Sequence, residues 1–320
     1  MLEFSGHLSI HSDSTRPRQI MISSLKGILL VLLSSLCFSV SGTLQALAPE
    51  GATPFIITES RMLIGALFLF LWCALTRKLP HSLSSIPWKP LILCGLFLAI
   101  GQICFFTGMY HIGVSTGAII SVGSSPLFAA VIARILYKKT PSASWYIATF
   151  LAIVGIVMIN GLSIEFDRAL YIVVLLMDGF FYAAYITISP KLMDKLNADT
   201  AVMLVLSVVA VILLPTLFIF PTAWAYSSVR GILVCLGIGI ITAGMAFTLL
   251  TAGARLVSPT VASTLCLAEP MAAACWGIFL LKEDSSPLTL TGIGMIFASI
   301  IVLLVAESQA ELKRHRTNLT

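Results

Sequence analysis

The chain has 320 residues, of which 58% are hydrophobic and 10% are charged, and its net charge is +5. A soluble domain carries about 25% charged residues, so this composition excludes an ordinary soluble enzyme or binding module and indicates an integral membrane protein. The positive charge does not indicate nucleic-acid binding, because basic residues mark the cytoplasmic side of membrane proteins.

Ten windows are apolar over roughly the 20 residues that a helix needs to cross a bilayer. Short connections rich in Pro, Gly or charge separate the windows, and none alternates polar and apolar residues as barrel strands do. We therefore predict an all-α integral membrane protein with ten transmembrane helices. In chain order they are 26–47, 54–76, 89–110, 114–137, 143–162, 169–189, 200–220, 229–253, 258–281 and 288–306.

The 19 Lys and Arg are unevenly distributed about these windows. With the N-terminus inside, 15 lie on the cytoplasmic side, three lie outside and Arg61 lies within a span. Because cytoplasmic loops carry an excess of Lys and Arg, this split predicts cytoplasmic tails at 1–25 and 307–320. The expected location is the plasma membrane, taken as a bacterial inner membrane.

The two halves of the chain contain related stretches, YHIGVSTGAIISVGSSP at 110–126 and ARLVSPTVASTLCLAEP at 254–270, at an offset of 144. Each is a loop followed by half a span that ends in Pro. The halves, 26–162 and 168–306, hold five spans each, so the second must be inverted relative to the first. Inverted repeats are typical of secondary transporters, which bind substrate near the midplane between the repeats.

The sequence AEPMAAACWGIFLLKE at 268–283, with its first-half partner SSPLFAAVIARILYKK at 124–139, resembles the drug/metabolite transporter superfamily, specifically the EamA-type ten-helix exporters. The stretch 241–263 and Arg61 add to the resemblance, which covers about 26–306. The resemblance implies a basket of helices around a central cavity. It also implies export of small metabolites or amino acids, driven by an ion gradient or by the substrate's own gradient.

Glu269 and Pro270 interrupt the ninth span near its middle. A charge at that depth costs at least about 2.5–3.5 kcal/mol, and Pro removes a backbone hydrogen bond. We therefore predict a helix discontinuity at Pro270 and at its repeat partner Pro126. The Glu269 carboxyl is expected either to contact substrate or exchange a proton, or only to fix helix packing, and both alternatives stay open.

Asp178 lies midway along the sixth span, where the same cost makes a lipid-facing position unfavourable. Tyr182 and Tyr185 follow at spacings of four and seven and share its face. If the halves pack as the repeat suggests, Asp178 and Glu269 face one cavity. Two acids there favour a cationic or amine-bearing substrate, or a proton, although a packing role for each residue remains open.

Ser124 and Ser125 are the repeat partners of Ala268 and Glu269, and would either form the other wall of a site or bond back to their own helix. Arg61 is expected to form a structural ion pair with another helix or to snorkel. The weaker candidates are Gln45, Gln102, Tyr110, His111 and Asn160.

A secondary transporter is favoured over a membrane-embedded enzyme, a channel and a non-transporting scaffold. The chain has no H-E-x-x-H or nucleotide-binding loop, its five His fall in tails or loops, and its seven Cys form no C-x-x-C pair. We therefore expect no catalytic residues, no metal site and no cofactor. The expected partners are a small-molecule substrate and the lipid bilayer, with no nucleic acid. A homodimer through Gly113-x-x-x-Gly117 or Gly294-x-x-x-Ala298 is left open.

Overall fold

The computed structural model describes residues 15–80, 82–112, 114–138, 140–160, 169–280 and 286–317, and all regular structure in these ranges is helical. Gly113 and parts of the predicted tails lie outside them. The α-helices are α1 (Thr15–Ser39), α2 (Ser41–Ala46), α3 (Pro54–Leu75), α4 (Trp88–Ile112), α5 (Val114–Tyr137), α6 (Ala143–Asn160), α7 (Ala169–Ile188), α8 (Ala198–Leu213), α9 (Thr216–Ile219), α10 (Val229–Gly239), α11 (Ala246–Ala254), α12 (Pro259–Leu265), α13 (Ala268–Leu280) and α14 (Pro287–Thr317). Short 3₁₀ turns form η1 (Leu83–Ser85), η3 (Ser189–Asp194) and η4 (Ala223–Ala225), and η5 (Ile240–Met245) is a π-helix.

Eight of the ten predicted windows coincide with helices that are long and apolar enough to span a membrane. The other two windows, the fifth at 143–162 and the ninth at 258–281, hold the shorter apolar helix α6 and the pair α12 and α13, respectively. The prediction of an all-helical membrane fold is confirmed. Eight candidate spans lie within the described residues, and a total of ten requires α6 and the α12–α13 pair to cross as well.

The helices that the repeat predicts to be equivalent run antiparallel to one another. The offset of 144 carries α3 onto 198–219, the span formed by α8 and α9. Cys73 near the end of α3 lies 3.8 Å (Sγ to Oγ1) from Thr200 near the start of α8. Farther back along α3, Gly65 lies against Leu206 of α8. Equivalent helices with opposite directions are the geometry expected of inverted repeats.

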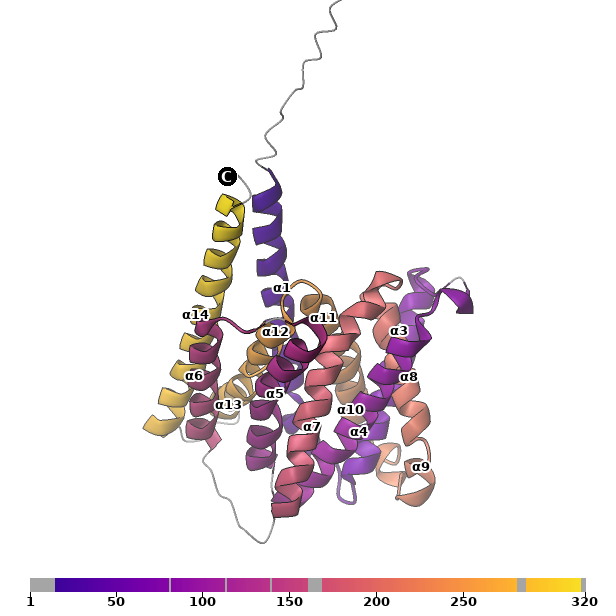
Figure 1. Ribbon diagram of the computed structural model, residues 1–320. Coiled ribbons are helices and arrows are strands. Elements are labelled where there is room, and N and C mark those ends of the chain that lie inside the picture. The colour runs from indigo at the N-terminus through magenta and orange to yellow at the C-terminus, as the bar shows by residue number, and fades with distance from the viewer. Residues whose placement is uncertain are drawn as a thin grey trace, which may run out of the picture.

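Contacts between helices also follow the repeat. Helix α6 packs on α14 and α3 packs on α8, and each of these pairs joins equivalent helices. Helix α7 packs on α4 and α5, and its equivalent α1 packs on α11, α12 and α13 in the same way. Figure 1 shows the resulting bundle, in which helices of the two halves alternate. The interface between the halves therefore runs through the centre of the molecule.

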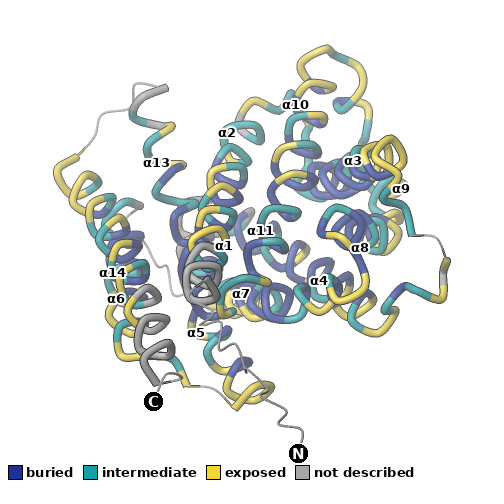
Figure 2. The backbone as a smooth tube through the Cα atoms, turned by 90° about the horizontal axis from the view of Figure 1, so that it is seen from above, coloured by how far each residue is buried: buried dark blue, intermediate teal, exposed yellow. Residues whose placement is uncertain are grey.

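The outer surface of the bundle is apolar. Large apolar side chains such as Phe150, Val211 and Phe218 are exposed. Seen from above, exposed positions lie on the rim and buried positions lie toward the interior (Figure 2). In water such a surface would be costly, whereas in a bilayer it faces acyl chains.

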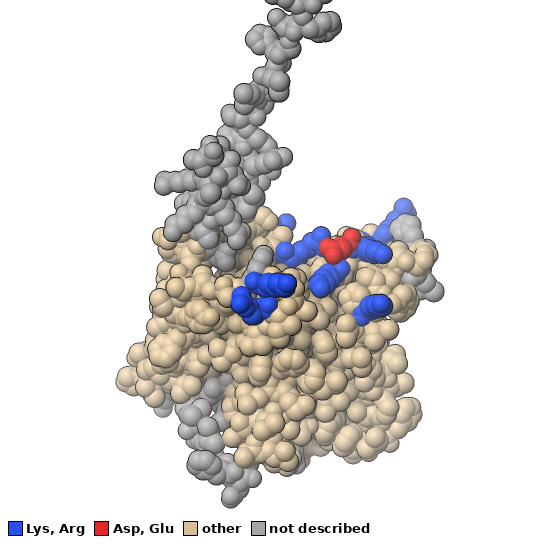
Figure 3. Space-filling view, in the orientation of Figure 1, with Lys and Arg blue, Asp and Glu red and all other residues tan. Residues whose placement is uncertain are grey.

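Charged side chains gather at one end of the bundle. On the face shown in Figure 3, Lys and Arg lie along the upper edge, and the flank below is almost uncharged. This is the end from which the first turns of α1 and the last turns of α14 project (Figure 1). Two ion pairs join helix ends, Lys78 Nζ to Asp199 Oδ2 at 2.7 Å and Arg255 Nη1 to Asp194 Oδ1 at 3.3 Å.

Candidate functional site

The α-helical hydrogen-bond pattern is interrupted between α12 and α13, where Leu267 and Glu269 donate to carbonyls three residues back. Ser258 caps the start of α12, α12 ends at Leu265, and α13 starts at Ala268. The Cys266 carbonyl, which Pro270 cannot engage, accepts a hydrogen bond from the Glu269 backbone N–H at 3.0 Å. Glu269 therefore stands in the first turn of α13, where the positive end of the helix dipole favours a carboxylate.

The first-half counterpart behaves differently. Pro126 lies inside α5, which continues unbroken from Val114 to Tyr137, so the structure shows no discontinuity there. Ser124 Oγ donates to the Ser121 carbonyl and Ser125 Oγ to the Val122 carbonyl, each at 2.9 Å. Both predicted serines thus bond back to their own helix, the second of the two alternatives.

Asp178 is buried, with 6% of its surface exposed, on α7. Its Oδ2 accepts a hydrogen bond from the Ser121 hydroxyl of α5. On the other side, a Cβ at Gly101 of α4 would lie 2.9 Å from Asp178 Oδ1, so a larger residue there would require this carboxylate to shift. Helices α4 and α5 of the first half therefore enclose an acid from the second half.

Arg61 is the buried cation among the described residues, with 5% of its surface exposed. Its Nη1 donates to Gln102 Oε1 of α4 at 3.2 Å, and its Nη2 donates to the Thr242 carbonyl of η5 at 2.9 Å. The guanidinium carbon lies 5.6 Å from the Phe38 ring centroid and 5.7 Å from that of Phe247, which are cation–π distances. The guanidinium is thus fixed by residues of both halves.

Arg61, Asp178 and Glu269 form what we call the central charged cluster. The Arg61 guanidinium interacts electrostatically with both carboxyl groups, and the two carboxyl groups interact with each other. Within the described residues Arg61 makes no direct ion pair of the kind we predicted for it, and its hydrogen bonds go to neutral partners. Glu269 is half-buried as a residue, whereas Arg61 and Asp178 are buried.

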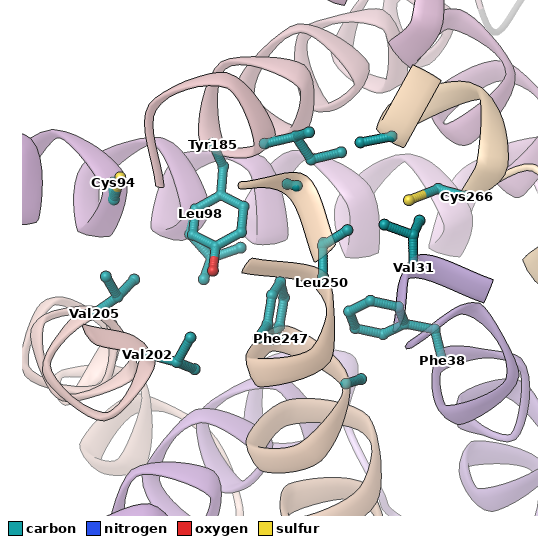
Figure 4. Close-up of a cluster of buried hydrophobic side chains, with 14 of the residues drawn as sticks. Val31, Phe38, Cys94, Leu98, Tyr185, Val202, Val205, Phe247, Leu250 and Cys266 are labelled. Atoms are coloured by element: carbon teal, nitrogen blue, oxygen red, sulfur yellow. The ribbon is translucent and has the colours of Figure 1, made fainter. Parts of the chain in front are cut away.

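The two predicted tyrosines have different surroundings. The Tyr182 hydroxyl lies 3.6 Å from Cys266 Sγ, at the turn between α12 and α13, and interacts electrostatically with Arg61. Tyr185 is fully buried in the apolar core, edge-on to Phe247 (Figure 4). Its hydroxyl pairs with Thr251 at 2.9 Å. Tyr182 therefore lies beside the central charged cluster, whereas Tyr185 lies in the apolar core.

Sequence reasoning missed the supporting residues Ser121, Thr242, Phe38 and Phe247, and ranked Gln102 low. Ser121 precedes Ser124 by one helical turn, and that spacing was the available signal. The π-helix that presents the Thr242 carbonyl had no signal in the sequence. His111, expected in a loop, lies in the last turn of α4 and stacks on Tyr171 with ring centroids 3.8 Å apart.

Two segments of the chain, residues 25–161 and 169–305, each match the EamA-like transporter family. The chain belongs to the EamA-like transporter family. The two matches cover one half of the chain each, in agreement with the internal repeat. The family resemblance inferred from the residues around Pro126 and Pro270 is thereby confirmed.

Relatives of this EamA-like chain are named as transporters. It is 31% identical over 280 residues to the uncharacterized transporter YwfM of Bacillus subtilis, a match covering 87% of this chain and 93% of the relative. It is 24% identical over 278 residues to the pseudopaline exporter CntI of Pseudomonas aeruginosa, covering 87% and 95%. A crystal structure that shares 15% identity has the same fold, with a TM-score of 0.75 over 89% of this chain and 98% of the other. The chain is thus a membrane transporter by family.

Among the described residues, no group of three or more His, Cys, Asp or Glu side chains is arranged to hold a metal ion. The chemistry that the central charged cluster offers is charge pairing, hydrogen bonding and proton exchange.

Proposed function

We propose that this protein is a secondary active transporter that exports small metabolites or amino acids across the plasma membrane by alternating access. The observation that carries the proposal is the central charged cluster. Buried charges in a membrane are costly, and their usual role is to bind substrates or move ions. The family and the names of the relatives support transport.

The position of the cluster supports this function. Arg61 comes from α3 of the first half, whereas Asp178 and Glu269 come from α7 and α13 of the second. A site assembled from both halves changes its geometry when one half rocks against the other, as alternating access requires. The turn before α13 places Glu269 at a helix start, where a small movement of the backbone changes its surroundings.

The presence of Arg61 alters the expected substrate. Two acids alone favour a cation, but the guanidinium balances one of them. The cluster therefore suits a small molecule that carries an amine together with an acidic group, or an amine alone. A relative is named as a pseudopaline exporter, so pseudopaline belongs in a substrate panel beside amino acids and amines.

We also propose ten spans in two inverted halves, with both termini cytoplasmic in a bacterial inner membrane. The antiparallel run of α3 and α8, and the Lys and Arg at the end where α1 and α14 project, support this arrangement (Figure 3). Cysteine accessibility at positions in both tails of spheroplasts tests it. Crosslinking in native membranes would test whether the protein forms a homodimer.

Counterflow in proteoliposomes tests transport. Wild type, Glu269→Gln and Glu50→Gln are loaded with one substrate class at a time, and uptake of labelled substrate is followed. Glu50→Gln is the matched control, because Glu50 is exposed in the connection before α3. We expect uptake for one class, normal in the control and strongly reduced in Glu269→Gln. Normal uptake by Glu269→Gln assigns this carboxyl to packing, and absence of uptake for every class by a folded wild type favours a scaffold.

A further inference from the structure

Glu59 is a buried carboxyl that the central charged cluster does not use. It lies on α3 and none of its surface is exposed. Neither carboxyl oxygen has a hydrogen-bond partner among the described residues. Residues two apart on a helix point in different directions, so Glu59 does not face the cluster that Arg61 joins.

Glu59 begins a buried stripe of α3, and Cys73 at the far end of this stripe contacts Thr200 of α8. The later members of this stripe at helical spacing are Met62, Ala66, Leu69 and Cys73, all buried. The antiparallel register of the two helices carries Glu59 to the last turn of α8, just before the helix ends. The surface that α8 offers there is apolar, so this position would ordinarily hold an aliphatic side chain.

Among the described residues, no neighbouring charge balances the charge that an ionised Glu59 carboxyl would carry. The elements packed on α3 are α4, α8, α9, α10 and η5. Their titratable groups whose side chains the structure describes, together with the one other on α3 near this position, are Arg61, Lys89, Cys94, Cys104, His111, Asp199, Arg230 and Cys235. In the part of the chain that the structure describes, none of these groups pairs with Glu59 or acts on it electrostatically. An isolated buried carboxylate of this kind becomes neutral by binding a proton.

The site has a short path to one side of the bundle. Glu59 is five residues from the start of α3 at Pro54, or about 8 Å along the axis at 1.5 Å per residue. Arg77 and Lys78 follow the other end of α3, so the Pro54 end is the one away from the basic edge. The same end has a second unpaired group, the Trp224 indole N–H, in a cluster with Ile56 and Ile57. Unpaired buried groups of both kinds call for a partner that the described residues do not supply.

Helix α3 joins this carboxyl mechanically to the central charged cluster. It carries Arg61, whose bond to the Thr242 carbonyl ties α3 to the π-helix η5. Gly65 brings the two elements close, since a Cβ there would lie 2.8 Å from the Ala243 Cβ. A movement of α3 away from α8 would open the surroundings of Glu59 to water and, because α3 carries Arg61, would also displace the guanidinium. Protonation at Glu59 and the geometry of the cluster are therefore linked through one helix.

We propose that Glu59 is the proton-binding site that couples this transporter to a proton gradient. The carboxyl holds its proton while α3 and α8 are packed as in the structure. It gives the proton to water when α3 and α8 move apart. The proposal rests on the transport function proposed above and names its coupling ion.

Infrared spectroscopy tests the protonation without a substrate. Purified wild type at neutral pH should show a protonated-carboxyl C=O band that decreases in Glu59→Gln and is unchanged in Glu50→Gln. Gln is isosteric with the protonated acid, so we expect the variant to fold, and size-exclusion chromatography checks this. An unchanged band in Glu59→Gln overturns the proposal. If the variant does not fold, the same band is followed in Glu59→Asp, where a shift supports the assignment and an unshifted band overturns it.

Transport in proteoliposomes tests the coupling. With a substrate found by counterflow, an imposed pH gradient should accelerate wild-type transport. Glu59→Gln should keep its counterflow and lose this acceleration completely, and Glu50→Gln should keep both. A wild type that the gradient does not accelerate, or a Glu59→Gln variant that it still accelerates, overturns the coupling role. A wild type without counterflow contradicts the transport function itself, and the infrared result then decides on Glu59 alone.

Discussion

Replacing Arg61 by Lys and by Met separates the contribution of its positive charge to stability from the contribution of its planar guanidinium geometry. Its two hydrogen bonds, to Gln102 and to the Thr242 carbonyl, involve a charged donor, and each such bond contributes about 1.5–3 kcal/mol. Lysine keeps the charge, but a compact ammonium cannot reproduce the planar fork that reaches acceptors on two elements. We expect Arg61→Lys to lower the free energy of unfolding by about 1.5–3 kcal/mol, the value of one lost bond.

Arg61→Met removes the charge as well. Asp178 and Glu269 then lose their buried counter-charge, and breaking a buried charge arrangement by removing one partner costs about 3–5 kcal/mol. Neutralising both acids as well, in the triple variant with Asp178→Asn and Glu269→Gln, removes the uncompensated charge. We expect this triple variant to be more stable than Arg61→Met alone, with a coupling energy of about 0.5–3 kcal/mol.

Unfolding of the purified variants by SDS in mixed micelles measures these differences. The expected order of stability is wild type, Arg61→Lys, then Arg61→Met, with the triple variant above Arg61→Met. Wild-type stability of Arg61→Met would show that the guanidinium contributes nothing to the fold. A triple variant whose losses simply add would show that the three charges do not act as a unit.

Three further predictions concern neighbouring contacts. Gly101→Val should abolish counterflow while the protein stays folded by size-exclusion chromatography, because its side chain would displace the Asp178 carboxylate; retained counterflow would contradict the tight fit. Tyr185→Phe should lower the free energy of unfolding by about 1 kcal/mol, the value of one buried hydrogen bond, and leave counterflow intact; a loss of counterflow in this variant would place the hydroxyl in the site. The Asp199 carboxylate raises the pKa of Lys78, so the ion pair stabilises the fold below the ordinary lysine pKa and is lost only as pH rises through the raised value. Asp199→Asn should thus cost about 1 kcal/mol or less, equally at mildly acidic and mildly alkaline pH, and a cost that changes between them would refute this.

The architecture was predictable because hydrophobic length and charge asymmetry act locally. A window such as 169–189 needs only its own residues to form a helix, since in a bilayer every backbone group must find its partner within the segment. The repeat was visible because Pro126 and Pro270 occupy matching positions. The family followed from the same residues.

The site was predictable only in part. Glu269, Asp178 and Tyr182 were found because polar groups are conspicuous in apolar runs. Arg61 was noticed but assigned to a structural pair, because the chain does not show which helices enclose it. The expected symmetry between the two prolines did not hold, since α5 continues through Pro126 whereas α12 ends before Pro270.

The sequence by itself determined that this chain spans a membrane, that it is built from two related halves and where the intramembrane acids lie along the chain. Each of these properties is set by hydrophobicity and spacing within single segments. Only the tertiary structure decided that Arg61 joins Asp178 and Glu269, that Ser121 rather than Ser124 reaches Asp178, and that Glu59 finds no hydrogen-bond partner among the described residues. These facts depend on the rotation and register of helices distant in sequence, which the packing of the two halves fixes and no single segment encodes.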